Sequence, residues 1–130
     1  MKVLFLAGRV LAGGFYIYSG VHHFFNLTSL TGYARMKGVP LADLAVPATG
    51  LLLLIAGFSF LLGYQPRIGI AAIVLFLVAV TPMMHGFWAE TGAARAQDLG
   101  NFTKNLALLG SALMFLLIPR PWPLSLGTKA

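Results

Sequence analysis

The chain has 130 residues, of which 58% are hydrophobic and 9% are charged. Soluble domains carry charge on roughly a quarter of their residues, so this composition excludes a soluble domain and predicts one integral membrane domain over residues 1–130. The net charge is +6 and there is no cysteine. The basic residues lie mostly at the ends of apolar runs, which is typical of headgroup anchors and argues against nucleic-acid binding, and disulfides and thiolate metal sites are excluded.

The first apolar run, at about residues 3–25, is long enough to cross a hydrocarbon core of about 30 Å. A cleaved signal peptide is the alternative, but Arg9 interrupts the apolar segment early and no small-x-small cleavage site follows it. Arg9 itself has two interpretations. It is a functional charge inside the membrane, or its side chain extends to the interface, which its depth of about two turns favours.

A more polar segment, residues 26–43, separates the first and second apolar runs. Thr28 or Ser29 is suited to cap a short helix that continues to Lys37, and Gly38 and Pro40 are stop signals after it. The mixture of apolar and basic side chains in this helix is typical of a segment that lies in the membrane interface.

Three further apolar runs predict membrane helices at about residues 44–63, 68–88 and 101–118. The turn between the second and third runs is very short, so these helices are predicted to be antiparallel neighbours, and Pro82 is expected to kink the third. The fold class is therefore all-α: an integral membrane four-helix bundle with a short interfacial segment between helices 1 and 2. Four spans place both termini on one side, and a small excess of basic residues there predicts that this side is cytoplasmic.

This topology brings one group of polar residues to the membrane boundary opposite the termini. Asn101, Lys104 and Asn105 are spaced i, i+3 and i+4 and so share one helical face, while His85 and Trp88 end the preceding helix. Such residues face the bundle or a wet cavity when they are functional. The alternatives are that Lys104 extends to the interface, Asn105 makes one interhelical hydrogen bond and His85 binds a backbone carbonyl.

No metal site is predicted from the histidines. His22 and His23 are adjacent and point about 100° apart on a helix, and Glu90 is the only carboxylate expected near them. We also find no nucleophile–base pair, phosphate-binding loop or dinucleotide-binding fingerprint in the sequence.

An ordered set of short motifs resembles the DoxX family of small four-helix bacterial membrane proteins. The motifs are GRVL at 8–11, SGVHHF at 19–24, YARMKGVP at 33–40, LGYQPRIG at 62–69, MHGFW at 84–88 and FTKNLALLG at 102–110. Some relatives in that family are linked to a thiosulfate:quinone oxidoreductase and others to redox homeostasis, so the resemblance implies a fold and a redox connection. This chain departs from the family pattern at His22, where a lysine is common, and at Thr49-Gly50, where an acidic residue is often found.

We therefore expect a membrane subunit or partner of a quinone-linked redox system in the bacterial inner membrane, with a quinone as a non-covalent cofactor. Whether the chain is itself an enzyme stays open. The alternatives are a non-catalytic accessory subunit of a larger membrane complex and a component of a small-solute transporter or channel. Expected partners are the lipid bilayer and either other membrane subunits or further copies of the chain. The candidate quinone-binding residues are His85, Trp88, Asn101, Lys104, Asn105, His22 and Arg9.

Overall fold

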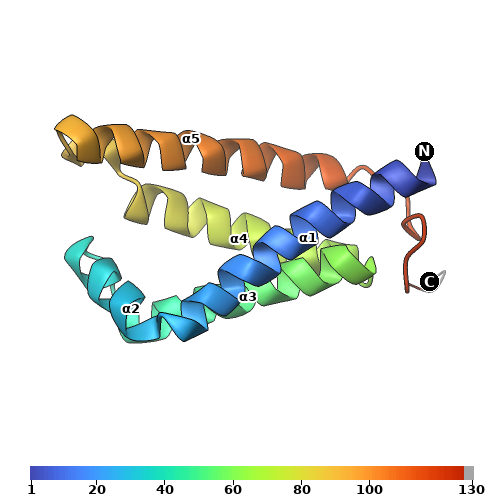
Figure 1. Cartoon of the computed structure of the whole chain (residues 1–130), viewed down its shortest axis with the longest axis horizontal. Helices are drawn as coiled ribbons and strands as arrows, with labels where there is room; N and C mark the ends of the chain where they lie inside the picture. The colour runs from blue at the N-terminus through green and yellow to red at the C-terminus, as the bar shows by residue number, and fades with distance from the viewer. Residues whose placement is uncertain (128–130) are drawn as a thin grey trace.

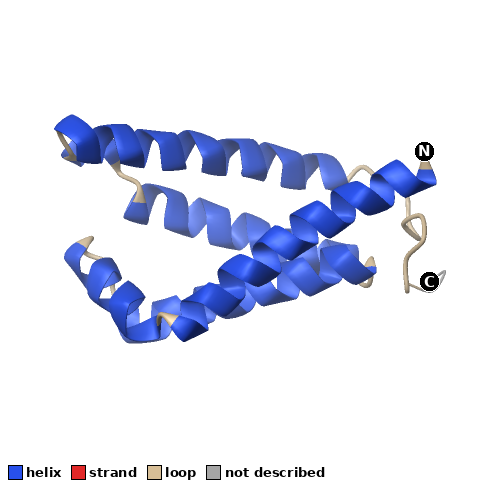
Figure 2. Ribbon diagram, viewed as in Figure 1, coloured by secondary structure: helices blue, strands red, loops and turns tan. Residues whose placement is uncertain are grey.

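The computed structural model describes residues 1–127, and all regular structure within them is helical, as predicted (Figure 2). The helices are α1 (Lys2–Phe25), α2 (Leu27–Met36), α3 (Ala42–Leu62), α4 (Pro66–Met84), the short 3₁₀ helix η1 (Phe87–Ala89) and α5 (Gly92–Phe115). The predicted interfacial segment corresponds to α2.

Within residues 1–127, three segments are long and apolar enough to cross a membrane: α1, α3 and the stretch Pro66–Ala89 that contains α4. Helix α5 has the same length as α1, 24 residues, but its first half is polar. It returns antiparallel beside α4 (Figure 1). The chain is thus a multi-pass, all-α membrane protein.

The long helices pack in the order α1, α3, α4, α5. At the end of the molecule where the chain begins, α1 also approaches α5 through an aromatic cluster formed by Phe5, Phe60, Phe115 and Trp122. Toward the other end α1 and α5 diverge, and α2 continues outward beyond α1 and α3 (Figure 1). The structure is closed at the end near the termini and wider at the other end.

Glycines set the close crossing of α1 and α3. A Cβ on Gly13 would lie 2.8 Å from the Gly57 carbonyl oxygen, and one on Gly20 would lie 3.0 Å from the Gly50 carbonyl oxygen. The two glycines on each helix are seven residues apart, so antiparallel backbones meet twice along one seam. Close approach of the backbones fixes the angle at which α1 leaves the bundle.

The core lies between α3 and α4, with contributions from α1 and α5. Leu53, Phe60, Ile73 and Leu77 are its largest fully buried apolar side chains. In a membrane these residues gain little from the hydrophobic effect between helices, so their close packing is what holds α3 against α4.

Arg9 is buried within the protein, with 1% of its surface exposed. Its guanidinium donates hydrogen bonds to the backbone carbonyls of Phe60, Leu61, Pro123 and Leu124, at distances of 2.7 to 3.2 Å. The last carbonyls of a helix have no partner within it, and an arginine offers five donors in a fixed plane. Arg9 therefore binds the C-terminal end of α3 and fixes the C-terminal segment to it.

The last two predicted helices have different ends in the structure. The third ends at Met84 instead of residue 88, since His85 and Gly86 leave helical geometry before η1. The fourth begins at Gly92, nine residues before the predicted start, and ends at Phe115 instead of 118. Residues 93–97 are Ala, Ala, Arg, Ala and Gln, which are good helix formers but do not make a long apolar run, so hydropathy placed the start too late.

Candidate functional site

A cavity of about 580 Å³ lies where α1 and α5 diverge, and side chains from α1, α2, α3, α4 and α5 line it. Most of the lining is apolar, including Leu53, Phe76 and Leu77. Tyr18 on α1 and Lys104 on α5 also line it and are exposed at its edge, so the cavity opens between these two helices. Its volume falls within the range of about 300–1,000 Å³ typical of small-molecule sites.

Asn105 is the buried polar residue of the cavity wall. It is 7% exposed, lines the cavity, and makes no side-chain hydrogen bond within residues 1–127. No fully shielded side-chain atom in this part of the chain lacks a partner, so the Asn105 amide is accessible from the cavity. A buried amide has two donors and an acceptor to satisfy, which makes it a natural contact for a polar group of a ligand.

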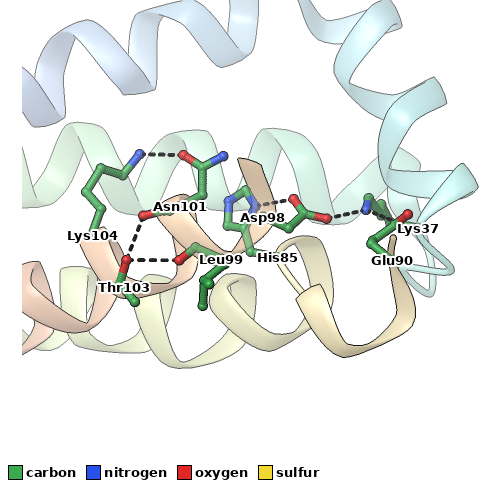
Figure 3. Close-up of polar contacts among 9 residues, drawn as sticks. Lys37, His85, Glu90, Asp98, Leu99, Asn101, Thr103 and Lys104 are labelled. Carbon is green, nitrogen blue, oxygen red and sulfur yellow. Dashed lines mark hydrogen bonds and ion pairs between the residues drawn. The ribbon is translucent and has the colours of Figure 1, made fainter. Parts of the chain in front are cut away.

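His85 lines the same cavity and is held by a carboxylate. Its Nδ1 lies 3.3 Å from Oδ1 of Asp98, which is 5% exposed (Figure 3). Because an ionised carboxylate only accepts hydrogen bonds, Nδ1 carries the proton and donates. The other ring nitrogen, Nε2, is then left for the cavity, as an acceptor when the imidazole is neutral and a donor when it is protonated.

Lys37 connects Asp98 to the segment after α2. Its Nζ donates to Oδ2 of Asp98 and to Oε1 of Glu90, both at 2.7 Å (Figure 3). These two carboxylates raise the pKa of Lys37 above its ordinary value. Lys37 in turn lowers the pKa of Asp98, an effect that outweighs the opposing effect of burial. Asp98 lies before residue 101, in the polar first turns of α5, so this ionic group ties the end of α2 to the start of α5.

The opposite wall of the cavity carries two more histidines on α1. His23 Nδ1 donates to the Ser19 carbonyl at 2.8 Å, which leaves its Nε2 uncommitted. His22 pairs with the Asn26 side chain at 3.1 Å. Hydrogen-bonding groups are thus present on both the α1 wall and the α4–α5 wall of a mostly apolar space.

The cavity brings together four of the seven predicted site residues: His22, His85, Lys104 and Asn105. Asn101 lies beside them and accepts a hydrogen bond from Lys104 at 3.1 Å (Figure 3). Neither Asn101, Trp88 nor Arg9 is among the residues that line the cavity.

Trp88 is 62% exposed and packs against Phe87 and Phe102, outside the cavity lining. Arg9 is also separate from the cavity, since its donors are bound to carbonyls at the end of the molecule near the termini.

Sequence reasoning missed Asp98 and Lys37, and the expectation that Glu90 is the only carboxylate near the histidines was wrong. The fourth helix predicted from the sequence begins at about residue 101, which leaves Asp98 outside it, whereas α5 begins at Gly92. The spacing of Asp98, Asn101 and Asn105, i, i+3 and i+7, was the available signal, since it puts all three on one face of a longer helix. Nothing in the sequence indicates that Lys37 reaches this face.

Comparison with known proteins supports the resemblance drawn from the motifs. The DoxX family model matches residues 4–86, a range that includes His22, Lys37 and His85 but ends before α5. The chain is 25% identical over 127 residues to the inner membrane protein YphA of Escherichia coli (strain K12), an alignment that covers 98% of this chain and 90% of that protein. No solved structure matches the chain. The family match covers well over half of the sequence, and the chain belongs to the DoxX family.

Proposed function

We propose that this DoxX-family membrane protein is a component of a quinone-linked redox system and that its cavity binds the quinone. The observation that carries the proposal is the unpaired, buried Asn105 amide in a mostly apolar cavity that also receives His85. A quinone is an apolar ring with carbonyl oxygens that accept hydrogen bonds, so it requires this combination of surfaces.

The residues of the cavity fit such a ligand. Asn105 and Lys104 offer N–H donors on α5, and His85 offers Nε2 from the end of α4. The opening lies between the membrane-spanning helix α1 and the helix α5, so a ligand with an isoprenoid chain would enter from the bilayer while its chain stays in lipid. The quinone would supply the electron-accepting chemistry, and its electrons would come from a partner protein.

The proton chemistry of the site belongs to His85 and Asp98. Asp98 accepts the Nδ1 proton of His85 and so sets the orientation and tautomer of the ring. With Nδ1 bound to Asp98, Nε2 is the ring nitrogen that can exchange a proton with a ligand in the cavity. Lys37 keeps Asp98 ionised, which preserves this arrangement.

We further propose that the protein lies in a bacterial inner membrane with both termini in the cytoplasm. The E. coli relative carries the inner membrane in its name. Lys2, Arg67 and Arg120 lie at the end near the termini, with Arg9 close to it, whereas the basic residues at the cavity end are Arg35, Lys37, Arg95 and Lys104. The small excess of basic residues that the sequence places on the side of the termini supports this orientation.

The direct test is a titration of purified protein in lipid nanodiscs with a short-chain quinone, followed by native mass spectrometry. Wild-type protein should bind one quinone. Asn105→Leu, which keeps the size of the side chain, should weaken binding by at least about tenfold, because a buried ligand carbonyl would lose its donor. His85→Gln should also weaken it.

Thr103→Val is the matched control, since Thr103 is on the same helix as Asn105 but is exposed and outside the cavity lining. Equal binding by Asn105→Leu and Thr103→Val would reject the cavity as the quinone site. Protein extracted gently from its own membrane adds a second test. Stoichiometric association with large partners, without quinone binding, would favour the accessory-subunit alternative.

A further inference from the structure

The end of the molecule near the termini carries unbalanced positive charge. All three acidic side chains of the chain are at the other end, and each is paired with a lysine or arginine there: Arg35 with Asp43, and Lys37 with Glu90 and Asp98. Arg67 and Arg120, at the end near the termini, form no ion pair within residues 1–127. Two arginines without a partner at a membrane boundary attract an anion from outside the protein.

These two arginines line one recess of about 270 Å³. Arg67 comes from the first turn of α4, and Arg120 from the segment that follows α5. Helix α4 begins with Pro66 and has no side-chain cap, so the partial positive charge of its N-terminus adds to that of the arginines. The recess thus combines two guanidinium groups with a favourable helix end.

Arg120 belongs to a segment that the rest of the fold holds in place. Trp122 is buried and packs against Phe5, Phe60 and Phe115. Arg9 donates to the carbonyls just after Trp122, and the Leu126 amide donates to the Leu62 carbonyl at 2.9 Å. The backbone that presents Arg120 is therefore fixed to α3, which packs against α4, and a bound anion does not have to order it.

The remaining lining of the recess is partly apolar. It includes Leu116 and Leu117 at the end of α5, whose side chains are exposed. A free inorganic anion would gain nothing from these side chains. A phosphate ester that carries acyl chains would place its charge on the arginines and its chains along the apolar surface.

We propose that this recess binds the phosphate group of an anionic phospholipid, with Arg67 and Arg120 as the two residues that contact it. Arginine suits this role because its planar donors pair with phosphate oxygens in a bidentate geometry. The site is on the opposite membrane boundary from the quinone cavity and does not depend on that proposal. It gives the protein a lipid contact specific to the leaflet on the side of the termini.

The test uses delipidated protein in detergent, titrated with phosphatidylglycerol or with zwitterionic phosphatidylcholine and examined by native mass spectrometry. Wild-type protein should prefer phosphatidylglycerol. The double variant Arg67→Gln, Arg120→Gln should bind it about 10- to 30-fold more weakly, the loss expected when two cations near an anionic headgroup are removed. Arg35→Gln, which removes one arginine at the other boundary, should retain the preference.

Both arginines are exposed, so the variants should keep the wild-type melting temperature, and this is measured in parallel. Conservative replacement of both arginines by lysine should keep part of the preference, since the charge remains but the bidentate geometry is lost. Equal binding of the two lipids by wild-type protein, or no effect of the double glutamine variant, would overturn the proposal. Displacement of the lipid by millimolar inorganic phosphate would reassign the recess to a soluble phosphate.

Discussion

At the scale of single residues, Asp98 connects the candidate site to the fold, because one carboxylate accepts from both His85 and Lys37. Its lowered pKa means that this contribution to stability is complete above the ordinary aspartate pKa of about 4 and is lost as the pH falls further. The raised pKa of Lys37 means that its contribution is complete below about 10.4 and is lost at higher pH. The ionic group should therefore be intact from about pH 5 to pH 10.

Asp98→Asn tests this at the residue scale. We expect the apparent melting temperature in detergent to fall by at least about 4 °C at pH 7, and the gap from wild type to narrow as the pH drops below about 4. Glu90→Gln is the control, since Glu90 contacts the same lysine but is more exposed than Asp98, and its effect should be smaller. A wild-type protein no more stable than Asp98→Asn at pH 7 would contradict the assigned pairing.

At the scale of elements, the crossing of α1 and α3 decides where the cavity lies. A Cβ on Gly57 would meet the Ile17 backbone nitrogen at 2.7 Å and the Gly13 carbonyl oxygen at 2.9 Å, so the two helices would have to separate. Gly57→Ala should destabilise the protein by about 1–3 kcal/mol, the usual cost of overpacking. The measurement is unfolding in a denaturing detergent, followed by circular dichroism.

Gly14→Ala is matched to it, because Gly14 is beside Gly13 on the same helix and an added Cβ there would have nothing within 4 Å. That substitution should be neutral or stabilise α1 by up to about 1 kcal/mol, since alanine is the better helix former. Equal stability of the two variants would show that the helices do not meet at Gly57.

The same close contact between α1 and α3 extends to the cavity. A Cβ on Gly50 would lie 2.8 Å from Cβ of His23, which lines the cavity.

At the scale of the whole molecule, the small excess of basic residues on the side of the termini predicts the orientation in the membrane. The sequence contains no cysteine, so single cysteines report accessibility without background. We expect Ala93→Cys, at the cavity end, to react with a membrane-impermeant maleimide added outside intact spheroplasts. Tyr64→Cys, between α3 and α4, should react only after the membrane is opened. The reverse pattern would place the termini outside.

The sequence by itself determined the membrane location, the all-α class, the extents of α1 and α3, and the boundary at which His22, His85, Lys104 and Asn105 gather. These features follow from local properties, namely the length and hydropathy of each run and the spacing of polar residues along a helix. Where hydropathy and helix propensity disagreed, at the start of α5, the sequence-based prediction failed.

Only the tertiary structure decided which polar residues act together. Lys37 and Asp98 are 61 positions apart in the chain, and they meet because α2 extends beyond α3 and because α5 begins early enough to place Asp98 opposite it. Arg9 serves the fold because the end of α3 and the C-terminal segment both present carbonyls to it. Contacts of this kind depend on how separate elements pack, and neither the hydropathy nor the periodicity of a single segment contains that information.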